Sequence, residues 1–198
     1  MLASPFRHTA RALCTTLLVG LPAFSWAASD SELRDALAAA REQQWEQLDT
    51  RSIESHPLKG YVEYHRLRGQ LPHLSPDRVQ GFIHQYADSP LAVWMRGQAI
   101  AKYGHAGRYN DLLAVADGEP AGTARQCYYY TALMATQPQQ ASEAGLNLWR
   151  TGSSQPDACD PLFNRLRANG TIDATAIWER KMLAWQAGET RLSNYLGG

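Results

Sequence analysis

Two cysteines are the side chains of this chain best suited to chemistry. Cys127 stands in the sequence QCYYY (126–130), and Cys159 stands 32 positions later in DACDPLF (157–163). A cysteine pair forms a structural disulfide, acts as a redox couple or stays reduced. Redox couples are usually close in sequence, as in Cys-x-x-Cys, and this pair is not. The choice between the other two depends on the compartment of the protein.

The N-terminus has the pattern of a secretory signal peptide. Arg7, His8 and Arg11 precede an apolar run over 12–24, and the sequence SWA (25–27) follows as a small-x-small cleavage site. The apolar run is too short for a membrane-spanning helix, which needs about 20 residues. We therefore expect cleavage after Ala27, export to the periplasm and no transmembrane segment in the mature chain.

Export decides how the cysteines behave. Cleavage removes Cys14 and leaves Cys127 and Cys159 as an even pair in an oxidising compartment, for which a structural disulfide is the expected state. Closing a loop of this length stabilises a fold by about 3.5 to 4 kcal/mol in the chain-entropy model. The pair is therefore predicted to be a staple and not a reactive site.

Composition excludes one class of partner. Cleavage leaves 17 of the 19 basic side chains against all 19 acidic ones, so the mature chain is close to neutral. Nucleic-acid binding needs clustered Lys and Arg, and we expect no nucleic-acid partner. The mature length and an apolar content of 44% suit one globular domain.

No catalytic, metal or cofactor motif is recognisable in the sequence. The histidines of the mature chain include no pair at the i, i+3 or i+4 spacing that metal sites on helices use. Neither a glycine-rich phosphate loop nor a Gly-x-Ser-x-Gly elbow is present. We therefore assign no catalytic residue, no cofactor-binding residue and no metal ligand.

Helix signals recur along the mature chain. Ser75-Pro76, Ser89-Pro90 and Asp160-Pro161 each place a capping side chain before proline at the first helical position. Helix ends are predicted by the glycines that fall after apolar-periodic segments: Gly104, Gly107, Gly118, Gly152, Gly170 and Gly188. The predicted helices cover residues 30–46, 58–71, 76–87, 90–104, 108–116, 121–136, 139–151, 160–169, 172–187 and 189–196.

Periodicity also predicts which side chains are buried. Two buried faces are expected, one with Leu91, Trp94, Met95 and Ala101, and the other with Ile172, Ala176 and Leu183. The tyrosine-rich segment 127–134 has the composition of a strand, but the helix-forming residues after it favour a helix.

Small residues recur where one predicted helix ends and another begins, at positions 40–45, 101–109 and 184–190. This pattern is typical of stacked helical hairpins. The predicted fold is all-α, an irregular α-solenoid, with a compact helical bundle as the alternative.

Several of these segments resemble one family of cell-wall enzymes. The sequences QCYYY (126–130), LWRTG (148–152) and SQPDACD (154–160), with Leu162-Phe163 and the weaker match YVEY (61–64), resemble the N-terminal part of soluble lytic murein transglycosylases. The resemblance implies a superhelix that forms part of a ring-shaped, U-shaped domain. In that family a C-terminal lysozyme-like domain follows the ring.

The resemblance also implies a reaction. These enzymes cleave MurNAc-GlcNAc bonds of peptidoglycan and form 1,6-anhydromuropeptides without water, using a glutamate in a Glu-Ser motif of the C-terminal domain. Glu54-Ser55 of this chain lies in the wrong domain and lacks the accompanying motifs, so a surface turn is expected there. No catalytic residue is carried over.

The expected organisation is a signal peptide over 1–27 and an incomplete superhelical domain over 28–198, without the catalytic domain. We expect a truncated, inactive scaffold that meets glycan strands only as part of the full-length family enzyme. One alternative is a free-standing periplasmic helical-repeat module that binds other proteins. Another is a short catalytic protein, for which Glu63 is the candidate by elimination.

Overall fold

The computed structural model describes residues 26–197, and the side chains of residues 30–197. This part of the chain folds into ten α-helices with three short 3-10 helices and no strand. The α-helices are α1 (Trp26–Arg41), α2 (Lys59–Gln70), α3 (Pro76–Gln85), α4 (Pro90–His105), α5 (Tyr109–Val115), α6 (Thr123–Leu133), α7 (Pro138–Trp149), α8 (Asp160–Ala168), α9 (Ala174–Gln186) and α10 (Thr190–Tyr195). The 3-10 helices are η1 (Trp45–Gln47), η2 (Leu71–His73) and η3 (Asp157–Cys159).

The predicted signal peptide lies outside the described residues except for Trp26 and Ala27, which begin α1. None of the helices in residues 26–197 combines the length and apolar character needed to cross a membrane.

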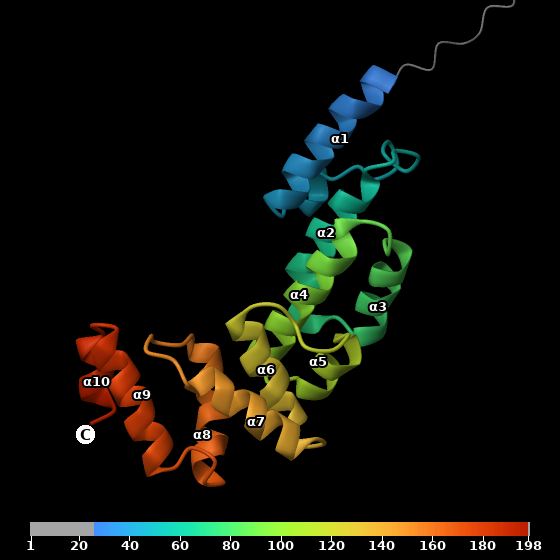
Figure 1. Ribbon diagram of the computed structural model, residues 1–198. Helices are drawn as coiled ribbons and strands as arrows, with labels where there is room; N and C mark the ends of the chain where they lie inside the picture. Colours follow the sequence, from blue (N-terminus) through green and yellow to red (C-terminus); the bar gives the residue numbers. More distant parts are fainter. Residues whose placement is uncertain (1–25, 198) are drawn as a thin grey trace, which may run out of the picture.

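The helices follow one another along a curved path from α1 to α10 (Figure 1). Packing is extensive between helices that are neighbours in chain order, as in α3 with α4 and α6 with α7, and between helices one step apart, as in α4 with α6. A compact bundle would instead gather its first and last helices around one core. The fold is therefore the predicted helical superhelix, and the bundle alternative is wrong.

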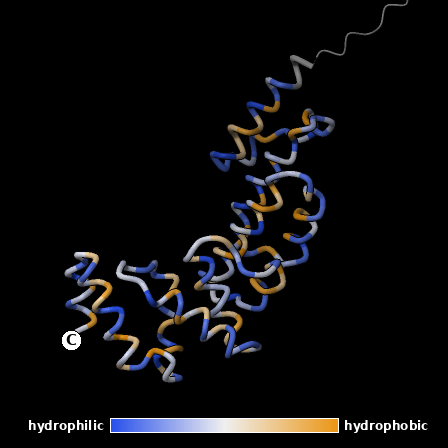
Figure 2. Tube along the Cα trace, viewed as in Figure 1, coloured by the Kyte–Doolittle hydropathy of each residue, from blue (hydrophilic) through white to orange (hydrophobic). Residues whose placement is uncertain are grey.

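Three apolar cores succeed one another along this path. The first joins α1 to α2 around Ile53 and Val62, the second runs from α2 to α6 around Met95 and Tyr103, and the third runs from α6 to α9 around Trp149. Hydrophobic and hydrophilic residues alternate along each helix, as an amphipathic pattern requires (Figure 2). Because α6 contributes to two cores, it is the joint between the two halves of the superhelix.

Local signals set most helix boundaries. The Ser75 and Ser89 hydroxyls accept hydrogen bonds from the backbone N–H groups of Arg78 and Leu91, as expected of N-caps before proline. Asp160 is not a cap, contrary to prediction. It is the first residue inside α8, because η3 leads directly into that helix and Cys159 takes the cap position.

Residues with positive φ end several helices. Gly107, Gly170 and Gly188 directly follow the C-caps of α4, α8 and α9, with φ between 70° and 79°, as predicted. The predicted stops Gly118 and Gly152 lie instead in the loops beyond the C-caps of α5 and α7. The prediction for the first helix was less accurate, since α1 ends at Arg41 and not at residue 46. Gln43 adopts φ 61° just after Arg41, and this left-handed conformation breaks the helical path.

The tyrosine-rich segment is helical, since α6 covers residues 123–133. Two buried-face predictions are wrong. Trp94 is 48% exposed and Leu183 is 38% exposed. Leu91 and Met95 define the buried side of α4, and Trp94 lies about 100° around the helix from its neighbour Met95. Trp94 packs instead edge-on against Tyr64.

Close approach of α4 and α6 depends on one glycine. A Cβ atom at Gly104 would lie 2.3 Å from Cγ of Tyr128, and a real Cβ never comes so close to another heavy atom. Gly104 is buried within α4, so it is not the helix stop that its sequence suggests. Its missing side chain makes the space into which the Tyr128 ring packs.

This contact predicts opposite effects for two glycine substitutions. Gly104→Ala should lower the free energy of unfolding by about 1 to 3 kcal/mol, because overpacking outweighs the gain in helix propensity. Gly81→Ala is the matched control, since Gly81 lies in α3 with nothing within 4 Å of its Cβ position. It should stabilise the protein by about 0.5 to 1 kcal/mol. Urea unfolding followed by circular dichroism measures both, and equal effects would contradict the packing argument.

Candidate functional site

The cysteine pair predicted from the sequence is a disulfide in the structure. Cys127 in α6 and Cys159 at the end of η3 are bonded, with their Cα atoms 4.8 Å apart. Both residues are fully buried, so neither sulfur meets solvent or a substrate. The bond ties α6 to the start of α8 and acts as a staple, because a catalytic disulfide needs access.

The side chains around the disulfide are structural. Thr131 is fully buried and its hydroxyl donates to the Cys127 carbonyl oxygen at 2.7 Å. Arg165 of α8 donates to the Thr131 carbonyl oxygen at 3.2 Å, which adds a second link between α6 and α8. Burial raises the pKa of the Tyr130 hydroxyl to about 12, helped by the nearby carboxylate of Glu119. Thr131, Arg165 and Tyr130 therefore have packing and hydrogen-bonding roles, and we assign none of them a reactive role.

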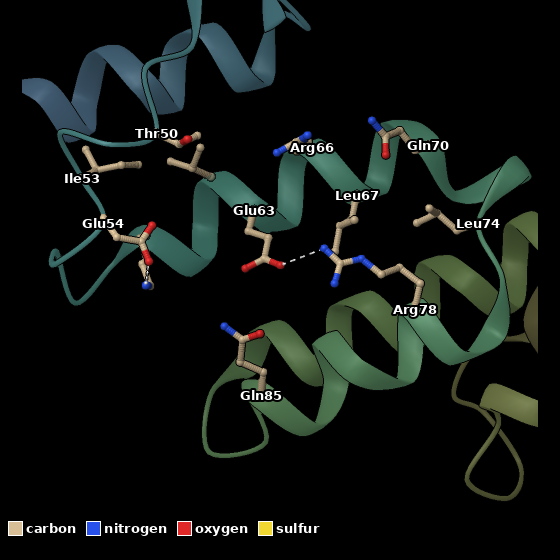
Figure 3. A pocket seen from close by; sticks show the side chains of 12 residues that line it. Thr50, Ile53, Glu54, Glu63, Arg66, Leu67, Gln70, Leu74, Arg78 and Gln85 are labelled. Atoms are coloured by element: carbon tan, nitrogen blue, oxygen red, sulfur yellow. Dashed lines mark hydrogen bonds and ion pairs between the residues drawn. The ribbon is translucent and has the colours of Figure 1, made fainter.

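Glu54 and Glu63, the two glutamates considered for catalysis, both line one open hollow of about 430 Å³ near the N-terminal end of the superhelix (Figure 3). Its walls come from the turn before α2, from α2 itself and from α3. Most lining side chains are polar: Thr50, Glu54, Lys59, Glu63, Arg66, Gln70, Arg78 and Gln85. The hollow is therefore the best candidate for a polar ligand among the features weighed from the sequence.

The Glu54-Ser55 pair forms the surface turn that was predicted. Both residues are exposed in the turn before α2, and the Glu54 carboxylate pairs with Lys59 at 2.7 Å. The Glu54 carboxylate therefore faces solvent and a cation. A general acid for glycosidic bond cleavage requires the opposite environment.

Glu63 is held by two structural partners. One carboxylate oxygen lies 3.7 Å from Nη2 of Arg78 (Figure 3), and the other accepts a hydrogen bond of 2.9 Å from the Tyr86 hydroxyl. Burial, and next the hydrogen bond and charge of Glu63, raise the pKa of Tyr86 to about 12. Tyr86 thus stays protonated and donates at neutral pH, and Glu63 serves as a carboxylate acceptor that ties α2 to α3.

The histidines offer no metal site in the part of the chain that the structure describes, where no group of three or more potential ligands gathers. His56 is buried and has a packing role. Its Nδ1 accepts from the Leu58 backbone N–H at 3.1 Å, so Nε2 carries the proton and donates to Asp30 at 3.1 Å. This pair fastens the start of α2 to α1.

Comparison with known proteins shows which proteins the chain is similar to. No family model matches the chain. A soluble lytic murein transglycosylase of Escherichia coli K12 is 34% identical over 147 residues, and a homologous protein of Salmonella typhimurium matches equally well. The chain is a homologue of part of the soluble lytic murein transglycosylases. The match covers 74% of this chain but only 23% of the length of the Escherichia coli relative.

Solved structures agree with this assignment. The 70 kDa soluble lytic transglycosylase of Escherichia coli superposes with a TM-score of 0.77 and 30% identity, over 87% of this chain and 28% of that one. An inactive variant of the lytic transglycosylase Slt of Pseudomonas aeruginosa has the same fold, with a TM-score of 0.69 at 23% identity over 83% of this chain and 27% of that one. This soluble lytic murein transglycosylase homologue thus shares their superhelical fold over part of their length.

Sequence reasoning singled out Glu63 but missed its partners. Arg78 and Tyr86 lie 15 and 23 positions away on or just after α3, and no local spacing links them to α2. The serine cap before Pro76 was the usable signal, because it sets where α3 begins and so which of its residues face α2.

The staple predicts a large loss of stability on reduction. Dithiothreitol should lower the free energy of unfolding by about 3.5 to 4 kcal/mol, because the unfolded chain regains the entropy of an open loop. Urea unfolding with and without reductant measures the loss. The double variant Cys127→Ala, Cys159→Ala is the control and should not respond to reductant. Two thiols that alkylate freely in the native exported protein would contradict the prediction.

The pairing of Tyr86 with Glu63 predicts a change of stability at high pH. The native state holds the Tyr86 proton up to about pH 12, whereas an unfolded tyrosine releases it near its ordinary pKa of 10.0. The free energy of unfolding should therefore fall as the pH rises from 10 towards 12. Tyr86→Phe should reduce this fall, and Glu63→Gln should reduce it in part. Unfolding curves across this pH range test it, and an unchanged slope in Tyr86→Phe would refute the role.

Proposed function

We propose that these helices are the non-catalytic scaffold of a peptidoglycan lytic transglycosylase. The observation that carries the proposal is the superposition on the 70 kDa Escherichia coli enzyme, which covers 87% of this chain and only 28% of that enzyme. A part of this size supplies a superhelical segment and not the whole protein. The superhelix is then an arc of the ring-shaped domain that the family resemblance implies.

The geometry of the acidic side chains supports an inactive scaffold. Cleavage of a MurNAc-GlcNAc bond needs a carboxyl group that first donates and then accepts a proton. Glu54 pairs with Lys59, and Glu63 is held by Arg78 and Tyr86, so both side chains are engaged in structural contacts. The murein-cleaving activity of the family would thus come from a lysozyme-like domain, with residues 28–198 as its superhelical support.

The proposal includes export. Residues 1–27 act as a signal peptide, and the mature chain works in the periplasm, where the Cys127–Cys159 disulfide is stable. Peptidoglycan glycan strands are then the substrate of the family enzyme to which the scaffold belongs, and this chain adds no cofactor.

An alternative is a free-standing periplasmic module that binds other proteins. Two exposed tryptophans of α9 favour it, because Trp178 is 58% exposed, Trp185 is 69% exposed, and their seven-residue spacing puts them on one side of the helix. Exposed tryptophans on one helix are typical of protein contact surfaces. The scaffold remains the first candidate, since it also accounts for the similarity to the transglycosylases.

The scaffold proposal predicts that the exported chain does not cleave murein. Purified mature protein incubated with murein sacculi should release no anhydromuropeptides above a buffer control, as measured by chromatography and mass spectrometry. The 70 kDa Escherichia coli enzyme serves as the positive control. Release of anhydromuropeptides that Glu63→Gln abolishes would overturn the proposal and make Glu63 catalytic. The intact mass of the same sample reports whether cleavage has occurred after Ala27.

A further inference from the structure

A second hollow lies near the C-terminal end of the superhelix, far along the chain from Glu63. It measures about 490 Å³ and opens between Trp149, the loop at residues 154–155, and helices α8, α9 and α10. No feature of the proposed scaffold function requires it. Its distinguishing feature is charge, because Arg167, Arg180 and Arg191 line it together with a single acid, Asp160.

Some other arginines of the described chain pair with an acid, whereas these three do not. Arg78, Arg96, Arg108 and Arg150 each lie within 4 Å of a carboxylate. In the described part of the chain no acid comes within ion-pair distance of Arg167, Arg180 or Arg191. The hollow therefore carries uncompensated positive charge.

Arg180 is the most unusual of the three. Only 4% of the residue is exposed, its Nη2 donates to the Ser153 carbonyl oxygen at 3.2 Å, and its buried Nε has no hydrogen-bond partner. Burial, and then the charge of Arg167, lower the pKa of its guanidinium below the ordinary value. A buried, unpaired donor on a charged group is costly unless an acceptor satisfies it.

Aromatic rings fix the position of this charge. The Arg180 guanidinium lies 4.1 Å from the centre of the Trp149 ring, and Arg167 lies 5.1 Å from the same ring. Trp149 is itself anchored, since its Nε1 donates to the Ala176 carbonyl oxygen at 3.0 Å. Two like charges are thus held beside one ring, an arrangement that an anion between them stabilises.

We infer that this hollow binds a carboxylate group of a peptide through Arg180, with Arg167 and Arg191 beside it. A carboxylate presents two oxygens in a plane and matches the planar donor array of a guanidinium. Phe163, Leu192 and Leu196 supply apolar walls for the residue that carries the carboxylate. A free inorganic anion would leave these walls without a contact. The carboxylate comes either from the end of a peptide or from an acidic side chain.

Binding of a small peptide to the exported chain tests this inference. N-acetyl-alanyl-alanine should bind saturably in isothermal titration calorimetry, and its C-terminal amide should bind at least tenfold more weakly. Arg191→Gln and Arg167→Gln, which change more exposed members of the site, should each weaken binding severalfold. Arg66→Gln is the matched control, because Arg66 lines the other hollow, and it should leave binding unchanged.

Further ligands identify the source of the carboxylate. Doubly blocked aspartate, which keeps only its side-chain carboxylate, should compete if acidic side chains are the natural ligand, and should fail if peptide ends are. Equal binding of acid and amide would overturn the inference. So would binding of inorganic phosphate alone, or binding that is insensitive to the arginine substitutions.

Discussion

The packing of α6 on both of its sides is the constraint on which the rest of the fold depends. One side of α6 meets α4, where Tyr128 fills the space left by Gly104. The other side carries Cys127, bonded to Cys159, and meets α8. Since helices pack against those adjacent or one step apart in chain order, no distant contact compensates for a weak joint. A covalent bond at this joint keeps the two halves of the superhelix in register.

Sequence signals predicted every α-helix because each signal is local. Serine before proline and glycine after an apolar stretch act within a few residues, and the even cysteine pair was interpreted through the compartment that the N-terminal sequence predicts. Side-chain partners could not be predicted in this way. Trp94 was assigned to the wrong face, and the partners of Glu63 come from a different helix. The arginine hollow was missed because its residues, from 149 to 196, meet only after three helices have packed.

The two hollows show how environment decides what a charged group can do. Glu63 has a cation and a hydroxyl at hydrogen-bonding or ion-pair distance, so its charge serves to connect helices. Arg180 is more deeply buried and retains an unsatisfied donor, so its charge remains open to an incoming group. Neither role could be predicted from the residue type alone. The difference comes from which helices the superhelix brings together around each side chain.

Packing between helices that are close in chain order also has a mechanical consequence. A small rotation between two adjacent helices displaces all the helices that follow them in the chain. Such rotations add up along the superhelix, so small local changes bend it as a whole. The Cys127–Cys159 bond stiffens the joint between α6 and α8, and bending is then concentrated in the arms on either side. A superhelix built in this way bends most at its two ends, while its middle keeps its curvature.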